Sequence, residues 1–215
     1  MFEVQALGPT GRSAVVQRRG VERLQAILDA AEKLLAKQGY EAATLKAIGE
    51  LAGIPTASLY HYFADRHQVD AELVRRHLSA LDARLTAAAT KSKARTLNDA
   101  IDVIIDEYLA YFREHPSFVQ LWFAGRSPAL EAMALAFDEA QAKRFWELLI
   151  EQKLIGSDTP QLVVQLAFEA GNRLFDVAFR RSPKGDDTTI GEARRLITAY
   201  LLTYATPASK RGKRK

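Results

Sequence analysis

The sequence predicts an all-α protein with a small N-terminal helical domain and a larger C-terminal one. Apolar residues recur at helical spacing along most of the 215 residues. Runs that alternate polar and apolar residues, as half-buried strands do, are absent. Short stretches rich in Gly, Pro, Ser or Asp separate the periodic segments, as connections between helices do. No internal repeat interrupts this pattern.

The first periodic segment begins at Val21. Residues 1–19 contain Gly8-Pro9-Thr10-Gly11 and no sustained period, so we expect a flexible arm there. From Val21 the apolar residues follow i, i+3, i+4 spacing, and Gly39 is placed to end the helix. The arm carries three arginines, Arg12, Arg18 and Arg19. They are consistent with entry into a DNA minor groove and equally with a solvated tail.

Two short helices follow, joined by a glycine-containing turn. Thr44 is a good N-cap for a helix over about residues 45–52, and Gly53 ends it. A second short helix is predicted over residues 56–63. The apolar residues expected to line the contact between them are Ile48, Ala52, Ile54, Leu59 and Phe63, with Leu45 and Leu51 completing the apolar stripe of the first helix. This arrangement is typical of a DNA-reading helix-turn-helix.

The outer face of the second short helix is polar and aromatic. It consists of Thr56, Ala57, Ser58, Tyr60, His61 and Tyr62. Hydroxyl and aromatic groups of this kind suit DNA phosphates and base edges in a major groove. The alternative interpretation is that Tyr60 and Tyr62 are core residues that pack inward, and that His61 is a surface residue without a role.

The rest of the chain predicts longer helices. They are expected at about residues 67–89, 117–124, 128–153, 160–181 and 189–204. One more helix is expected between the connection at 91–95 and His115-Pro116, which ends it. We therefore divide the chain into an arm (1–19), a helix-turn-helix domain (20–66), a larger helical domain (67–205) and a basic tail (206–215).

Bulk charge does not establish DNA binding. The net charge is +4, but the last six residues carry five positive charges. Without them the chain has 25 basic and 26 acidic residues, a balance of −1. That terminal cluster reads most simply as a solubilising tail, with nonspecific attraction to DNA as the alternative. The absence of cysteine excludes disulfides and thiolate metal sites, and no membrane span or signal peptide is evident, so we expect a cytoplasmic protein.

From Val21 to about Leu73 the sequence resembles the tetracycline-repressor (TetR) family of bacterial regulators. The resemblance rests on Gly39-Tyr40, Thr44, Ile48, Gly53-Ile54, the block from Leu59 to Phe63, and Arg66 three residues later. It implies contacts with operator DNA by Thr44, Thr56, Ala57, Ser58, Tyr60, His61, Tyr62 and Arg66. Thr44 would meet a phosphate at a helix N-terminus, and Arg66 would face another phosphate from the start of the fourth helix.

Two positions depart from the family's pattern. Pro55 stands where the family often has a capping side chain, so Thr56 would have to take over the cap and would then be less available to DNA. Gly49 replaces a usual Ala inside a helix at a cost of about 1 kcal/mol, which a close approach between helices would justify.

The resemblance also implies a small-molecule site and a dimer. The C-terminal half is rich in aromatic residues, which suits a largely apolar effector. The lining residues that we predict are Tyr108, Phe112, Phe118, Trp122, Phe137, Phe168, Asn172 and Phe175, with Trp122, Phe118 and Tyr108 foremost. The last two long helices would form a homodimer interface, which would set two recognition helices about 34 Å apart.

The rival classes have less support. The histidines, His61, His67, His77 and His115, form no metal-binding pattern, and Asp102, Asp106 and Glu107 lie on the polar face of a helix. There is no phosphate-binding loop or nucleophile motif, so we predict no catalytic residue, metal or cofactor. A DNA-binding protein without ligand control is the alternative, because only the aromatic C-terminal half argues for an effector.

Overall fold

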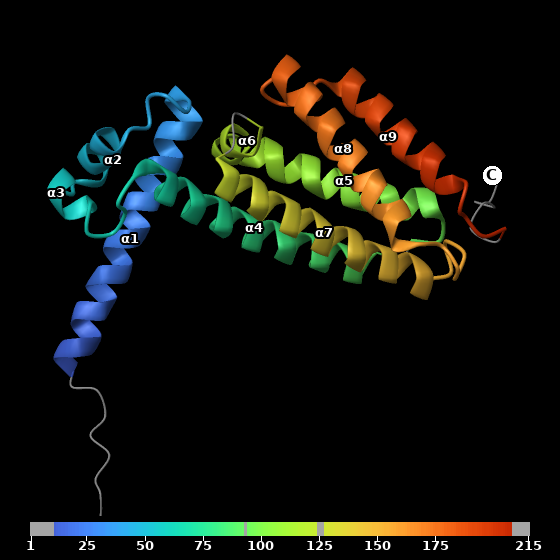
Figure 1. The fold of residues 1–215 in the computed structure, drawn as a ribbon, viewed down its shortest axis with the longest axis horizontal. Helices are drawn as coiled ribbons and strands as arrows, with labels where there is room; N and C mark the ends of the chain where they lie inside the picture. The colour runs from blue at the N-terminus through green and yellow to red at the C-terminus, as the bar shows by residue number, and fades with distance from the viewer. Residues whose placement is uncertain (1–10, 93, 124–126, 208–215) are drawn as a thin grey trace, which may run out of the picture. The chain divides into compact units, whose positions relative to one another are not determined.

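The computed structural model describes residues 11–92, 94–123 and 127–207 (Figure 1). Over these residues the regular structure is helical, and the all-α prediction is confirmed. The helices are α1 (Gly11–Gln38), α2 (Leu45–Ala52), α3 (Thr56–Leu59), α4 (Arg66–Lys91), α5 (Leu97–Glu114), α6 (Pro116–Phe123), α7 (Pro128–Glu151), α8 (Gln161–Arg181) and α9 (Asp187–Leu202). An isolated antiparallel bridge joins Ile155 and Ala205.

The chain forms two compact units whose boundary lies between Glu72 and Leu73, inside α4. The sequence placed the boundary six residues earlier, at the start of that helix. Within the described residues, no helix has the length and apolar character that crossing a membrane requires.

The first unit is built around α1 and α2. Ile27, Leu35 and Ile48 are fully buried, as is Leu59 of α3, and α2 packs on both of its neighbours in sequence. Gly39 follows α1 with a φ of +81°, a left-handed conformation that favours glycine. The expected helix end at this glycine is confirmed.

Two details of the first unit differ from expectation. The first helix begins at Gly11, so residues 11–19 are helical where we predicted a flexible arm. The apolar period starts only at Val21, but nothing between Pro9 and Gly20 forbids a helix, and Arg18 pairs with Glu22 one turn on at 3.1 Å. Leu51 was expected in the apolar stripe, but it is exposed. Residues 1–10, the side chain of Arg12 and residues 208–215 of the basic tail lie outside what the structure describes.

The second unit packs α5, α7, α8 and α9 around one apolar core. Helices α8 and α9 lie side by side, α7 packs on α8, and α5 packs on α9 (Figure 1). Thr96 and Asp99 form a reciprocal capping box at the start of α5. Arg84 of α4 reaches α5, where it pairs with Glu107 at 3.1 Å.

Candidate DNA-binding surface and ligand cavity

The turn between α2 and α3 depends on two glycines and a threonine. Ala47 N–H donates to the Thr44 hydroxyl at 3.2 Å, which confirms Thr44 as the N-cap of α2. Gly53 ends the helix with a φ of +67°. Ile54 N–H then returns to the carbonyl of Gly49 at 2.9 Å.

Gly49 occupies a position with no room for a side chain. A Cβ built there would lie 2.9 Å from the carbonyl oxygen of Ile54 and 3.5 Å from the Cδ1 of Leu59. The close approach that would justify a glycine inside α2 is therefore present. It brings the turn and α3 directly against the backbone of α2.

Thr56 does not cap α3. The N-cap is Pro55, which makes no side-chain capping bond, and Thr56 is the first helical residue. Its side chain is half-buried and is not consumed as a cap. Regular α-helix ends at Leu59, and turn hydrogen bonds continue to Phe63, whose N–H donates to the Leu59 carbonyl at 3.0 Å.

The remaining predicted DNA-contacting residues of the helix-turn-helix lie together on the surface of this segment. Tyr60 is 55% exposed, His61 and Ala57 are also exposed, and Ser58 and Tyr62 are half-buried. Leu59 and Phe63 face the core. Thus the two aromatic residues that would have been core residues under the rival interpretation are not buried, and Thr44 is exposed as well.

Arg66 lies differently from expectation. We predicted that it faces a phosphate, but its Nε donates to Asp70 Oδ1 at 2.6 Å and its guanidinium stacks 4.7 Å from the ring centroid of Tyr40. The Tyr40 hydroxyl donates to the other Asp70 oxygen at 2.9 Å. Asp70 is fully buried, and burial together with Asp70 raises the pKa of Tyr40. This network favours a role for Arg66 in fixing the start of α4; its phosphate contact stays a prediction that the geometry does not favour.

Four of the predicted ligand-binding residues lie together in an aromatic cluster. Phe118 packs on Phe112 and Trp122 with ring centroids 5.6 and 5.1 Å apart, and all three are almost completely buried. Phe137 packs edge-on against Trp122 at 6.3 Å. None of the four lines the cavities described below. Phe112, Phe118 and Trp122 belong to the apolar core and Phe137 packs against it, so ligand contact by these four residues stays a prediction.

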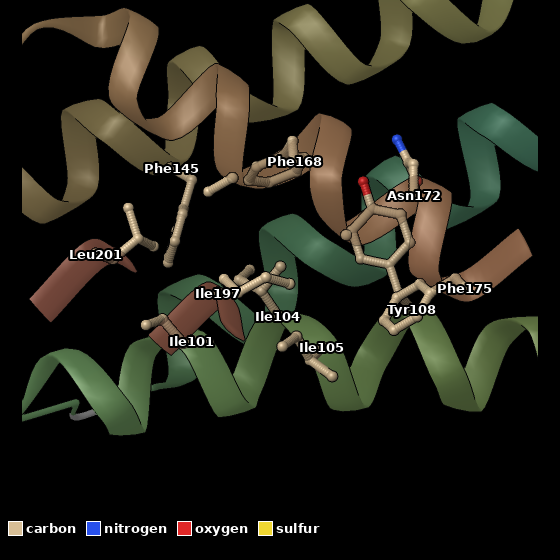
Figure 2. A pocket seen from close by; sticks show the side chains of 12 residues that line it. Ile101, Ile104, Ile105, Tyr108, Phe145, Phe168, Asn172, Phe175, Ile197 and Leu201 are labelled. Atoms are coloured by element: carbon tan, nitrogen blue, oxygen red, sulfur yellow. The ribbon is translucent and has the colours of Figure 1, made fainter. Parts of the chain in front are cut away.

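A partly open cavity lies between α5, α7, α8 and α9 (Figure 2). We call it the α5–α9 cavity; it holds about 460 Å³ of unfilled space, including the part open to solvent. Four predicted residues line it: Tyr108, Phe168, Asn172 and Phe175. The sequence reasoning missed the other lining residues, which are Ile101, Ile104, Ile105, Phe145, Ala167, Gly171, Ile197 and Leu201. Aliphatic residues at helical spacing carry no signal that separates cavity wall from core.

A second cavity, the α4–α7 cavity, adjoins the first. It holds about 620 Å³ by the same measure and lies between α4, α5, α7 and α8. Ile104, Tyr108, Phe145 and Phe168 line both cavities and so form the wall between them.

The polar residues that line the α5–α9 cavity are Tyr108 and Asn172. The Tyr108 side chain is only 5% exposed, and its hydroxyl has no hydrogen-bond partner among the described residues. Figure 2 shows Tyr108 and Asn172 at the same end of this cavity. Asn172 donates to Asp138 at 2.7 Å. Burial, reinforced by the Asp138 carboxylate, raises the pKa of Tyr108 well above its ordinary value, so the hydroxyl keeps its proton.

Both units of the chain match known protein families. Residues 27–72 match the family model for bacterial regulatory proteins of the tetR family. Residues 96–201 match the model for the tetracyclin repressor-like C-terminal domain.

Individual relatives give the same result. A TetR-family transcriptional regulator from Streptomyces coelicolor is 32% identical, with a TM-score of 0.64 over 85% of this chain and 99% of that one. RolR, solved with resorcinol, shares the fold at 16% identity, with a TM-score of 0.65 over 91% of this chain and 93% of that one.

Two curated regulators match over shorter stretches. The repressor KstR of Mycolicibacterium smegmatis is 32% identical over 41% of this chain, and the regulator BetI of Rhizobium meliloti is 30% identical over 50%. The matched stretches span 42% and 52% of those two proteins. The helix-turn-helix, the C-terminal helical domain and the full-length relative together show that this chain belongs to the TetR family of transcriptional regulators, which are DNA-binding proteins and not enzymes.

Proposed function

We propose that the protein is a dimeric regulator, a repressor in the usual mode of its family, that releases operator DNA when a small molecule enters its C-terminal unit. The observation that carries the proposal is the outer face of residues 56–62, where Tyr60 and His61 are exposed while Leu59 and Phe63 pack into the core. Such a segment offers hydroxyl, imidazole and aromatic groups to a major groove without disturbing the fold. A protein that binds duplex DNA in a bacterium would work in the cytoplasm.

DNA contact by this segment can be tested by removing single hydroxyl groups. If Tyr60 donates to a phosphate, Tyr60→Phe removes a hydrogen bond to a charged group, worth about 1.5–3 kcal/mol or roughly 10- to 150-fold in affinity. The loss should be similar for all duplexes, because phosphate contacts carry no sequence information. Fluorescence anisotropy with the promoter next to the protein's own gene measures it. Tyr204→Phe, at a partly exposed tyrosine of the second unit, is the matched control.

Base reading should behave differently. His61→Ala should reduce the preference for the operator over unrelated DNA, by about 1–3 kcal/mol if His61 reads one base pair. Footprinting on the same promoter shows whether the protected region carries two half-sites. Wild-type protein that ignores every duplex at low ionic strength would end the regulatory proposal.

A dimer through α8 and α9 is supported by apolar side chains that these helices leave exposed. Leu162 and Leu166 are one turn apart on α8, and Leu196 lies on α9. Exposed leucines at helical spacing suit a helix–helix interface between two copies.

The dimer proposal has a matched pair of variants. Leu166→Glu should convert the dimer to a monomer in sedimentation experiments. Leu135→Glu should not, although Leu135 of α7 is as exposed, at 51% against 50%. Monomeric wild-type protein would contradict this part of the proposal.

Ligand control is supported by the two adjoining cavities. Helix α4 contributes its first turns to the DNA-binding unit, and its later residues Leu85, Thr86, Ala89 and Thr90 line the α4–α7 cavity. We infer that a ligand there shifts α4 and so selects a conformation that fits DNA less well. A coupling of about 1–3 kcal/mol would reduce DNA affinity 5- to 150-fold.

The alternative is DNA binding without an effector. Titrating metabolites into the DNA complex decides between the two, since an effector must lower the affinity for DNA and DNA must lower the affinity for the effector by the same factor. An operator complex that no ligand of the cavities weakens would favour the alternative.

A further inference from the structure

The hydroxyl of Tyr108 is a buried polar group for which the described packing of the second unit provides no hydrogen bond. It is buried, it lines both cavities, and it has no hydrogen-bond partner among the described residues. A buried hydroxyl without a partner destabilises a protein, and a phenylalanine would fill the same space without that cost. The ring itself is well packed, edge-on to Phe168 with centroids 6.4 Å apart. A tyrosine here therefore needs a partner that the described part of the chain does not supply.

The surroundings of the hydroxyl restrict what that partner can be. Because burial raises the pKa of Tyr108, the group is a neutral donor at physiological pH. Asn172, the other polar residue that lines the α5–α9 cavity, already donates to Asp138. Only an acceptor satisfies the buried proton of this hydroxyl, so we take the ligand atom that meets Tyr108 to be a hydrogen-bond acceptor, such as a carbonyl, ester or ether oxygen.

The charged residues near these cavities argue against an anionic acceptor, such as a carboxylate. Among the described residues, no charged side chain lines the α5–α9 cavity. The one charged residue that lines the α4–α7 cavity, Arg144, is paired with Asp82, and this pairing lowers the pKa of Asp82. Of the charged groups that shift the pKa of Tyr108, the Asp138 carboxylate held by Asn172 has the largest effect, ahead of Arg144. A ligand carboxylate would thus lose its hydration without gaining an unpaired cation, and Asp138 would repel it.

We propose that the effector is an uncharged, largely apolar molecule whose single buried acceptor takes a hydrogen bond from the Tyr108 hydroxyl. Its apolar body occupies the α5–α9 cavity and reaches the α4–α7 cavity past the shared wall of Ile104, Phe145 and Phe168. The proposal rests on the proposed function only in calling this molecule the effector. The chemistry of the cavity is tested separately.

The test uses two naphthalene dyes of similar size with the full-length protein. Prodan is a neutral ketone, and ANS is an anionic sulfonate. Wild-type protein should bind prodan more tightly than ANS at 0.1 M salt. Tyr108→Phe should weaken prodan binding about 2- to 12-fold and shift its emission to shorter wavelength, because the ketone loses a hydrogen bond. Ile104→Phe, which fills space at the shared wall, should weaken prodan binding as well and so place the dye.

Thermal unfolding provides a readout that a merely structural tyrosine would not match. Without ligand, Tyr108→Phe should unfold at the same temperature as wild type or up to about 4 °C higher, because an unpartnered buried hydroxyl is removed. The control is Tyr111→Phe on the same helix. The Tyr111 hydroxyl lies 2.9 Å from His77 Nδ1, so its loss should lower the unfolding temperature and leave prodan binding unchanged.

Three results would overturn the proposal: equal prodan affinity in Tyr108→Phe and wild type, tighter binding of ANS than of prodan, or a Tyr108→Phe protein that unfolds at a clearly lower temperature. The last would mean that the fold itself uses the hydroxyl. Anisotropy with duplex DNA on the same preparations keeps this separate from the proposed function. Failure to bind DNA would refute the regulator and leave the dye results valid for the cavity.

Discussion

Replacing Gly49 by alanine tests the packing of the helix-turn-helix, because two opposing effects meet at this residue. In an ordinary helix interior, Gly→Ala adds about 1 kcal/mol of stability, partly by restricting the unfolded chain. At Gly49 the new Cβ would lie 2.9 Å from the Ile54 carbonyl oxygen, whereas ordinary contact begins at 3.4 Å. The turn would have to move by about half an ångström, and this oxygen belongs to backbone that cannot rotate away.

Overpacking of this kind costs about 1–3 kcal/mol. Gly20→Ala provides the matched control, since Gly20 also lies in a helix of the first unit and a Cβ there meets nothing within 4 Å. We expect Gly20→Ala to raise the free energy of unfolding by about 1 kcal/mol and Gly49→Ala to fall about 1–3 kcal/mol below that control.

Urea unfolding followed by circular dichroism measures both variants, and amide exchange at Ile54 reports the turn directly. That amide donates to Gly49 at 2.9 Å and should exchange faster in Gly49→Ala. If Gly49→Ala stabilised the protein as much as Gly20→Ala does, the close approach between α2 and the turn would be wrong.

Two further predictions concern buried titratable groups. Asp70→Ala removes the carboxylate that holds both Tyr40 and Arg66, so it should lower the free energy of unfolding by about 3–5 kcal/mol in urea titrations. Tyr40→Phe removes one hydrogen bond and should lower it by about 1 kcal/mol. Equal, small effects of the two substitutions would show that Asp70→Ala does not leave Arg66 as an unpaired buried charge. Burial, with His115 and Arg76 nearby, lowers the pKa of His77 to about 3 from 6.5. The unfolded chain therefore takes up a proton below pH 6.5 that the folded chain refuses, and stability is lost as the pH falls from 6.5 toward 3, by up to about 1.4 kcal/mol per pH unit from this group. Urea midpoints at pH 7.5, 6.5 and 5.5 should fall less steeply in His77→Gln than in wild type, and parallel slopes would contradict the assignment.

The features that the sequence predicted well are those that local chemistry determines. Thr44 caps α2 because a threonine hydroxyl reaches the N–H three residues on, and Gly39 and Gly53 adopt positive φ where helices end. The polar face of residues 56–62 followed from its spacing around Leu59 and Phe63. Such properties involve neighbours within a few residues, so they can be predicted before any tertiary contact is known.

The cavity walls could not be predicted in this way. Phe112 and Trp122 have the same aromatic, helical character as Phe168 and Phe175, yet the first pair fills the core and the second lines the cavity. The difference is where the helices leave space unfilled. That depends on the packing of elements far apart in sequence, such as α5 and α9, which contribute Ile104 and Ile197 to the cavity wall. Spacing within one helix carries no information about that gap.

Arg66 shows why a cation beside a recognition segment is a weak indicator of DNA contact. Two partners compete for its guanidinium: a phosphate of bound DNA, and the buried Asp70, with which it already forms an ion pair at 2.6 Å. Breaking a largely buried pair costs about 3–5 kcal/mol, whereas a solvent-exposed ion pair returns about 1 kcal/mol or less. The internal pair should therefore persist when DNA binds, and Arg66 then acts by holding the start of α4 in place. We therefore expect phosphate contacts from the Tyr60 hydroxyl and from the N-terminus of α2, which Thr44 caps.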